Sequence, residues 1–196
     1  MGNDAINHSK QSLRAHYRVI RSHISNEDAI KASESIKNQL LDFIGTNYKT
    51  PIVIAGYFPI NHELNILPLL NALHIKGHVC VMPKTTKNKP LEFKKWQTTD
   101  KTELNRNIQE PLATAQTLAP DIIIAPLLAC DKFGNRLGYG KGLYDIAIEH
   151  YRKLNPKLLV IGLCYHQQLS KTALPADPHD QKLDLVITDL LSNEMS

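Results

Sequence analysis

The sequence contains no apolar run that approaches the roughly 20 residues needed to cross a bilayer as a helix. Its first residues, MGNDAINHSKQSLRAHYRVI, place polar side chains where a secretion signal needs an apolar stretch. We therefore expect no membrane partner, no secretion and a cytoplasmic location. The formal net charge is only +4, and the basic residues are scattered, so we also expect no nucleic-acid partner.

Cysteine is scarce, with three residues in a chain of 196. Cys80, Cys130 and Cys164 are far apart and lie in apolar contexts, a pattern that indicates reduced, buried thiols. With 42% hydrophobic and 21% charged residues and no internal repeat, the chain has the composition of an ordinary globular protein. We expect a single domain over residues 1–196, acting as a monomer.

Short apolar runs rich in β-branched residues alternate with helical patterns along the chain. These runs predict strands buried on both faces at residues 52–57, 79–83, 121–126, 158–165 and 184–189. Helices are predicted at residues 66–75 and 142–153. The alternation predicts the α/β class: a single three-layer domain with a mostly parallel, twisted sheet and helices on both faces.

Two further helices are predicted within residues 1–48, where they pack on the sheet. Ser9 is expected to cap the first helix, and Ser25 followed by Asp28 resembles a capping box for the second. Residues 84–111 carry a weak pattern that is compatible with short edge strands and loops. Because ligands bind outside the carboxyl ends of parallel strands, the loops after residues 57, 83, 126 and 165 are expected to wall one pocket.

A glycine-rich segment, GNRLGYGKGLYD, occupies residues 134–145 after the strongest predicted strand. Glycines allow the backbone to approach a phosphate closely, and the following helix start favours an anion. Arg136 and Lys141 add positive charge at the same place. The Walker A and Rossmann spacings are both absent, since Gly142 follows Lys141 and Leu143 stands where a third Rossmann glycine belongs. The segment predicts an anion-binding loop of an ATP-using enzyme; the alternative is a plain strand-to-helix turn.

Other motifs argue against competing chemistries. His74 and His78 are spaced i, i+4, but Gly77 interrupts the helix and no glutamate follows His74, which disfavours a catalytic metal pair. No G-x-S-x-G elbow accompanies a strand, which disfavours an α/β-hydrolase. Asp145 lies in the predicted first turn of a helix, where it could serve the helix dipole alone or carry Mg²⁺.

Taken together, FGNRLGYGKGLYD after DIIIAPLLACD closely resembles the signature of the 5-formyltetrahydrofolate cyclo-ligase family, also called 5,10-methenyltetrahydrofolate synthetase. The K-x-x-L-R element at residues 10–14, GYFPINHEL and LPADPHDQKLDLVIT resemble further family elements in the same order. The resemblance implies conversion of a small-molecule folate, 5-formyltetrahydrofolate, to 5,10-methenyltetrahydrofolate with ATP and Mg²⁺, releasing ADP and phosphate. It implies phosphorylation of the formyl oxygen and attack by nitrogen-10.

The resemblance also implies residue roles. Lys141, Arg136 and Tyr139 would be catalytic. The implied ATP ligands come from the first helix and the glycine segment: Lys10, Arg14, Arg136, Leu137, Gly138, Tyr139, Gly140, Lys141, Gly142, Leu143 and Tyr144. The implied folate ligands are Ile60, Glu63, Asn65, Tyr139 and Leu143. Asp145 and Asp180 would bind magnesium, although Asp180 also fits a turn residue after Pro178.

Two positions depart from the family pattern. Asn65 occupies a place where an acid is common, and Leu143 replaces the first of two aromatics before Asp145.

Two other functions stay open on the residues alone. One is a sugar-phosphate isomerase or transferase that uses the loop for a phosphate without ATP. The other is a folate- or nucleotide-binding regulator without turnover.

Overall fold

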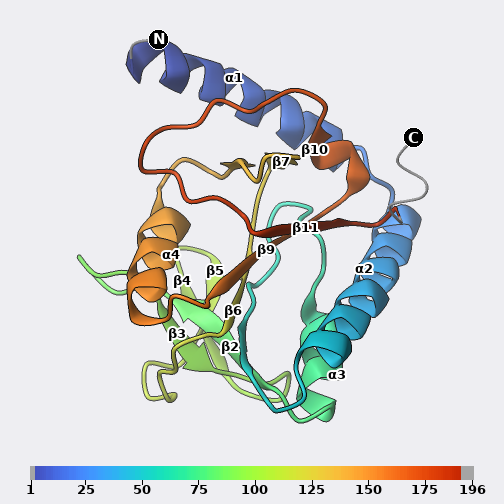
Figure 1. Ribbon diagram of the computed structural model, residues 1–196, viewed down its shortest axis with the longest axis vertical. Coiled ribbons are helices and arrows are strands. Elements are labelled where there is room, and N and C mark those ends of the chain that lie inside the picture. Colours follow the sequence, from blue (N-terminus) through green and yellow to red (C-terminus); the bar gives the residue numbers. More distant parts are fainter. Residues whose placement is uncertain (1–2, 191–196) are drawn as a thin grey trace.

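The computed structural model describes residues 3–190 of the chain. Its centre is a six-stranded sheet in the order β11-β9-β6-β1-β2-β3, with only the β2–β3 pair antiparallel (Figure 1). These strands are β1 (Val53–Ala55), β2 (Val79–Lys84), β3 (Glu92–Lys95), β6 (Ile122–Ala125), β9 (Leu159–Cys164) and β11 (Leu185–Thr188). The prediction of an α/β fold with a mostly parallel sheet is confirmed.

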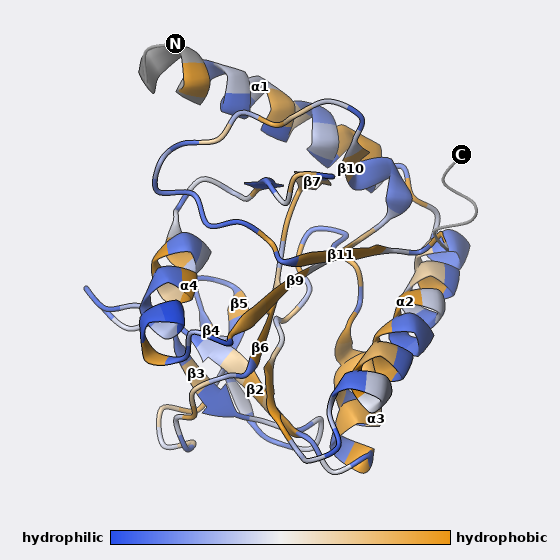
Figure 2. Cartoon of the chain, viewed as in Figure 1, coloured by the Kyte–Doolittle hydropathy of each residue, from blue (hydrophilic) through white to orange (hydrophobic). Residues whose placement is uncertain are grey.

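Helices cover both faces of this sheet. α2 (Asn26–Asn47) and α3 (Leu67–Ile75) pack on one face, and α4 (Leu143–Leu154) packs on the other (Figure 1). Successive strand residues point to opposite faces: Ile122 joins the core beneath α2 and α3, while Ile123 joins the core beneath α4. The central strands are therefore continuous apolar runs, drawn in orange in Figure 2.

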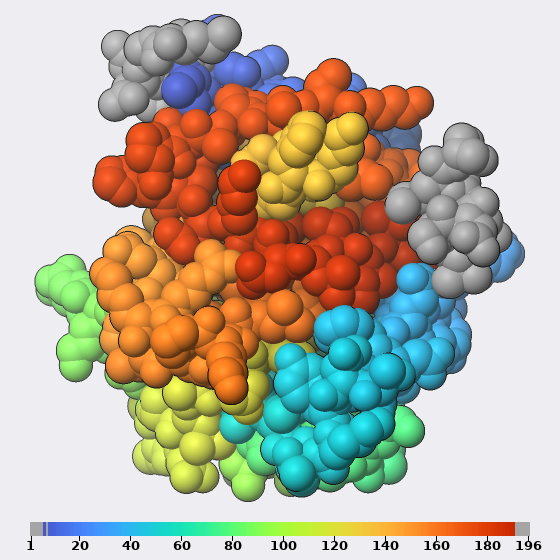
Figure 3. Space-filling model, viewed as in Figure 1, coloured from blue at the N-terminus to red at the C-terminus, as the bar shows by residue number. Residues whose placement is uncertain are grey.

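The carboxyl ends of the parallel strands are covered by α1 (Asn3–Ser22) and a small second sheet (Figure 1). That sheet consists of β7 (Ala129–Asp131), β8 (Arg136–Leu137) and β10 (Leu169–Ser170), and the short helix η1 (His166–Gln168) precedes β10. Tyr17 of α1 packs against Leu128 and Leu137 there. In Figure 3 the orange-to-red C-terminal part of the chain lies beside the blue α1. Segments from both ends of the sequence thus meet over the carboxyl ends of the strands.

The predicted helices and strands are found where the sequence placed them, with small differences at their ends. Ser25 is confirmed as an N-cap, since its Oγ accepts a hydrogen bond from the Asp28 amide at 3.1 Å. The prediction for Ser9 is wrong: α1 begins at Asn3, because no glycine or proline between them interrupts the helix. The predicted domain limits at residues 1 and 196 lie outside the described residues.

The weakly patterned region forms β3 and a hairpin of β4 (Thr102–Asn105) and β5 (Ile108–Pro111). Arg106 and Asn107 form its turn with left-handed backbones, φ 49° and 66°. The hairpin is held to the domain by Glu110, a buried carboxylate that accepts a hydrogen bond from the Thr85 amide at 3.1 Å. Within residues 3–190, no helix is long and apolar enough to span a membrane.

Candidate active site

A cleft of about 710 Å³ opens at the carboxyl ends of the parallel strands. Tyr57, Pro83 and Pro126 contribute the loops after β1, β2 and β6, as predicted. The connection after Tyr165 lines the cleft only in its later part, at Asp177 and Asp180. Tyr165 is buried, and the chain there forms η1, whose Gln168 side chain donates a hydrogen bond to the Leu128 carbonyl at 2.9 Å beneath α1.

The glycine loop, residues 138–142, runs from β8 to the start of α4. Gly142 is the N-cap of α4 in the left-handed region, and no side chain of the described residues caps that helix end. Gly140 has φ +96°, and a Cβ atom there would lie 3.2 Å from Cζ of Arg14. Arg14 Nε donates a hydrogen bond to the Gly138 carbonyl at 2.9 Å. Glycine is therefore needed both for the backbone path and for the close approach of Arg14.

Every residue that the resemblance assigns to ATP binding lines this cleft. Lys10 is 5% exposed, and its Nζ lies 2.5 Å from a carboxylate oxygen of both Asp177 and Asp180. Burial disfavours the charged form of Lys10, but the two carboxylates outweigh it, so the pKa of Lys10 is raised. Lys141 is exposed and forms no ion pair within the described part of the chain. The loop thus presents an ammonium group without an ion pair in residues 3–190, whereas Lys10 and Arg136 are already paired with carboxylates.

The two predicted magnesium ligands lie at the same corner of the cleft. Asp145 accepts hydrogen bonds from Arg136 Nη2 at 2.8 Å and from the Gln181 amide at 3.0 Å, so it joins α4 to the residue after Asp180. All hydrogen bonds that these two side chains accept from residues 3–190 go to Asp145 Oδ1 and Asp180 Oδ2, so one oxygen of each carboxylate accepts none from that part of the chain. Oxygen donors of this kind suit Mg²⁺. No group of three or more potential metal-ligating residues occurs among the residues described.

The opposite wall carries Glu63, which is buried in the loop after β1. Its Oε2 accepts a hydrogen bond from the Ile60 amide at 2.9 Å, and its Oε1 accepts one from the Tyr139 hydroxyl at 2.7 Å. Burial raises the pKa of Glu63, and the hydrogen bonds from Tyr139 and Ile60 only partly offset this. Leu143 is exposed on the same cleft. The glycine loop therefore touches the predicted folate wall through Tyr139.

Asn65, a predicted folate ligand, lies outside the cleft. Its side-chain oxygen accepts a hydrogen bond from the Leu67 amide at 3.1 Å, and its carbonyl accepts one from Ser33 Oγ at 2.6 Å. The side chain thus satisfies a backbone amide at the start of α3, which draws it away from Glu63.

Several residues in the cleft wall or directly behind it were not found from the sequence. Arg21 is buried behind the cleft, and it follows Lys10, Arg14 and Arg18 at intervals of four, four and three, a helical spacing that could have revealed a basic face. No motif or spacing in the sequence marks Asp177 as a residue of the cleft. The hairpin residues of the cleft wall lie in the weakly patterned region, where the sequence has no clear periodicity. They are Arg106, Asn107, Ile108, Gln109 and Glu110.

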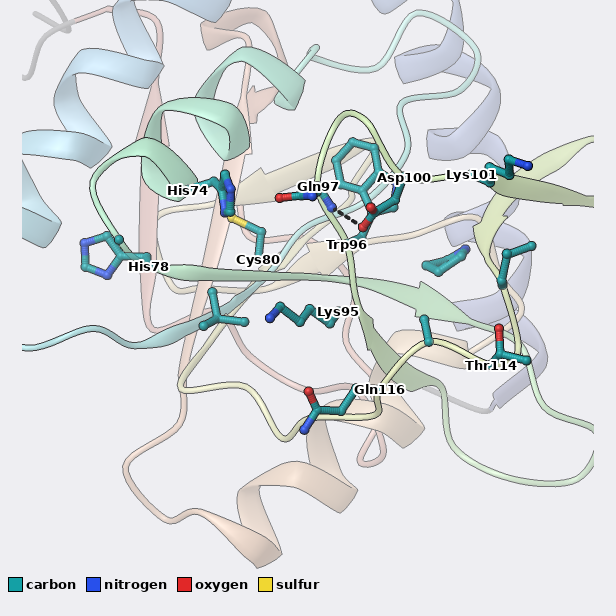
Figure 4. A pocket seen from close by; sticks show the side chains of 15 residues that line it. His74, His78, Cys80, Lys95, Trp96, Gln97, Asp100, Lys101, Thr114 and Gln116 are labelled. Atoms are coloured by element: carbon teal, nitrogen blue, oxygen red, sulfur yellow. Dashed lines mark hydrogen bonds between the residues drawn. The ribbon is translucent and has the colours of Figure 1, made fainter.

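A second cavity, of about 620 Å³, lies at the amino end of β2 (Figure 4). It contains His74 and His78 but no residue that the resemblance assigns to ATP, folate or magnesium. Burial raises the pKa of Cys80 in its wall to about 12, so this thiol is a poor nucleophile. Cys80, Cys130 and Cys164 are all free and buried, as predicted. The cleft at the carboxyl ends is the candidate active site.

The family model described as "5-formyltetrahydrofolate cyclo-ligase family" matches residues 6–189. The chain belongs to this family. It is 28% identical to the 5-formyltetrahydrofolate cyclo-ligase of Haemophilus influenzae, covering 89% of this chain and 94% of that protein. It is 29% identical to the 5-formyltetrahydrofolate cyclo-ligase of Mycoplasma pneumoniae, covering 92% and 98%.

Solved structures of the cyclo-ligase family have the same fold. The 5,10-methenyltetrahydrofolate synthetase of Mycoplasma pneumoniae aligns with a TM-score of 0.74 at 25% identity, over 92% of this chain and 99% of that one. The 5,10-methenyltetrahydrofolate synthetase of Aquifex aeolicus aligns with a TM-score of 0.76 at 26% identity, over 92% and 89%. The resemblance read from the sequence is confirmed, and the expectation of a cyclo-ligase enzyme is confirmed with it.

Proposed function

We propose that this protein converts 5-formyltetrahydrofolate to 5,10-methenyltetrahydrofolate, using ATP and Mg²⁺ and releasing ADP and phosphate. The observation that carries the proposal is the joining, in one cleft, of a glycine loop with basic side chains to a buried carboxylate through Tyr139. Family membership supports the folate reaction, and the geometry of the loop supports the nucleotide. The composition of the chain and the scattering of its charges favour a single-domain cytoplasmic monomer, with neither nucleic acid nor membrane as partner.

At the phosphate end, the backbone amides of the glycine loop and of the uncapped start of α4 would hold the ATP phosphates. Lys141 would add a charge without giving up an existing ion pair. Arg14 is already held against Gly138, so it would meet a phosphate with little loss of conformational freedom. Lys10 and Arg136 contribute positive charge whose carboxylate partners lie at the same corner.

Asp145 and Asp180 would hold the magnesium ion through the oxygens that accept no hydrogen bond from residues 3–190, and the ion would neutralise charge on the phosphates. Lys10 is buried between Asp177 and Asp180, so it keeps these carboxylates from repelling each other before a ligand binds. Arg136 likewise neutralises the charge of Asp145 before a ligand binds.

At the folate end, Glu63 would accept the paired N–H donors of the pterin ring, with Ile60, Tyr139 and Leu143 against its faces. The formyl oxygen then takes the γ-phosphoryl group, nitrogen-10 attacks the activated carbon and loses its proton, and phosphate leaves. Phosphoryl transfer needs alignment and charge neutralisation more than covalent help from the protein. Lys141, Arg136 and Tyr139 lie between the two ends and would supply that alignment.

The test is to mix the purified protein with 5-formyltetrahydrofolate, ATP and Mg²⁺ and to follow the absorbance of methenyltetrahydrofolate. Product should form only when all three are present. Omission of ATP is the matched control, because a sugar-phosphate enzyme or a binding regulator on this fold would not couple nucleotide consumption to this product. Absence of product with folate shown to be intact would overturn the proposal.

A further inference from the structure

Arg21 lies in the last turn of α1 with a side chain that is only 1% exposed. A guanidinium group keeps its charge in proteins, and burying a charge is costly unless it is paired and hydrogen-bonded. The fold therefore maintains a permanent positive charge in its interior. The groups that surround this charge indicate what it is for.

Three segments of the chain receive hydrogen bonds from Arg21. Its Nη2 donates to the Asn61 carbonyl and to the Tyr139 hydroxyl, both at 2.7 Å, and its Nη1 donates to the Leu127 carbonyl at 3.2 Å. These acceptors belong to the loop after β1, the glycine loop and the loop after β6. A single side chain thus sets the spacing of three loops that wall the cleft.

The direction of the hydrogen bonds follows from Arg21. An arginine can only donate, so the Tyr139 oxygen accepts from Arg21, and the Tyr139 hydroxyl in turn donates to Glu63 Oε1, 2.7 Å away. The other oxygen of Glu63 accepts from the Ile60 amide. Both oxygens of Glu63 are therefore acceptors, which is the arrangement of an ionised carboxylate. Arg21 Nη1 also lies 3.9 Å from Glu63 Oε1.

Within the described part of the chain, the other titratable groups that face Glu63 supply no positive charge. Tyr57 precedes it after β1, Tyr144 faces it from α4 and Tyr165 from the end of β9, and burial raises the pKa of each of these hydroxyls. They are neutral at neutral pH. Burial likewise raises the pKa of Glu63, while the hydrogen bonds from Tyr139 and Ile60 and the charge of Arg21 oppose its protonation.

We propose that Arg21 is the positioning residue of the folate pocket, which orients the Tyr139 hydroxyl and keeps Glu63 a carboxylate able to accept paired N–H donors of a ligand ring. Arg21 does not line the cleft, so it acts through Tyr139 and Glu63 and touches no substrate. The inference rests on the proposed function, because it assigns Glu63 to the pterin. It adds a residue that the sequence motifs do not contain.

The decisive measurement is the affinity for 5-formyltetrahydrofolate without ATP, by titration calorimetry, as a function of pH. In the parent protein, binding should weaken at low pH as Glu63 is protonated. We call the low-pH part of the curve, where affinity falls, the acid limb. Arg21→Met removes the charge and should raise the pH of this acid limb by about 1–3 units, because an opposite charge at this distance shifts a carboxyl pKa by that amount. Below the new pKa, affinity should fall about tenfold per pH unit. Arg21→Lys should return the limb toward that of the parent.

Tyr139→Phe is the second variant, for use where Arg21→Met lowers the yield of folded protein. It removes only the hydroxyl, so it should also move the acid limb upward while Arg21 stays in place. Glu63→Gln should abolish the acid limb, and adding Arg21→Met to it should restore no pH dependence. Arg152→Met is the matched control, since Arg152 pairs with Asp184, neither residue lines the cleft, and the variant should leave the limb unchanged.

An Arg21→Met protein that is folded by circular dichroism but keeps the acid limb of the parent would overturn the inference, and Arg21 would then serve the fold alone. An unchanged limb in Tyr139→Phe would overturn the relay through the hydroxyl. A parent protein that fails to bind 5-formyltetrahydrofolate at any pH would overturn the proposed function, and this assignment with it. The parent's own binding curve therefore distinguishes the two failures.

Discussion

Replacing Gly134 with alanine should destabilise the protein far more than replacing Gly142, although both glycines have left-handed backbones, with φ +79° and +65°. The difference lies in what a Cβ atom would meet. At Gly134 it would lie 2.4 Å from the Leu183 carbonyl oxygen, whereas at Gly142 it would have no neighbour within 4 Å. The Leu183 backbone cannot easily withdraw, because its amide donates a hydrogen bond to the Gly134 carbonyl at 2.8 Å.

The expected magnitudes follow from these two terms. A left-handed backbone costs a residue with a Cβ atom about 1–2 kcal/mol, which applies to both variants. Steric overlap with a backbone atom adds about 1–3 kcal/mol, which applies to Gly134 alone. Gly134→Ala should therefore lose about 2–5 kcal/mol and Gly142→Ala about 1–2 kcal/mol. At about 2–4 °C per kcal/mol for a chain of this size, thermal unfolding should separate the two clearly.

Urea unfolding followed by circular dichroism gives the free energies directly, provided that both variants keep the parent's dependence on urea concentration. Equal losses in the two variants would refute the reasoning, because the clash is the only difference that it invokes. Gly142→Ala has a second use. Since it should remain folded at room temperature, its KM for ATP reports on the glycine loop separately from stability.

Three further predictions concern single side chains. Lys141→Ala should lower turnover by about 100-fold or more with little change in unfolding, because Lys141 is exposed and unpaired within residues 3–190; steady-state rates beside Lys157→Ala check this, and an unchanged rate would remove Lys141 from the mechanism. Asp145→Asn should weaken the dependence of the rate on Mg²⁺, and a metal titration identical to the parent's would leave Asp145 as a partner of the helix dipole only. Asp131→Asn should cost about 1–3 kcal/mol at neutral pH, because Asp131 accepts four hydrogen bonds that hold the turn before β8 and the segment after β10. Burial raises the pKa of Asp131, but these bonds outweigh it and the pKa is lowered, so its contribution is present above the unfolded pKa of about 3.9 and is lost as pH falls through the folded pKa; a loss equally large at pH 7 and near pH 2 by urea unfolding would contradict this.

Local patterns in the sequence were enough to establish the fold class, most of the helices and strands, and the motif that names the family. A continuous apolar run such as residues 121–126 predicts a strand buried on both faces, because a strand with one exposed face would alternate apolar and polar residues. The glycine segment announced itself in the same way, since its glycines and charges are neighbours along the chain. β7, β8 and β10, each of two or three residues, were not predicted.

Tertiary structure decided which polar residues reach the cleft and in what state. Arg21 and Glu63 are 42 positions apart and meet only because α1 lies over the carboxyl ends of the strands. Asn65 is two residues from Glu63, yet the start of α3 takes its side chain elsewhere. Whether a charged side chain is buried depends on all the segments that pack around it, and a local sequence pattern does not show which segments these are. The motif therefore located the glycine loop, but the buried arginine beside Glu63 became visible only in the packed molecule.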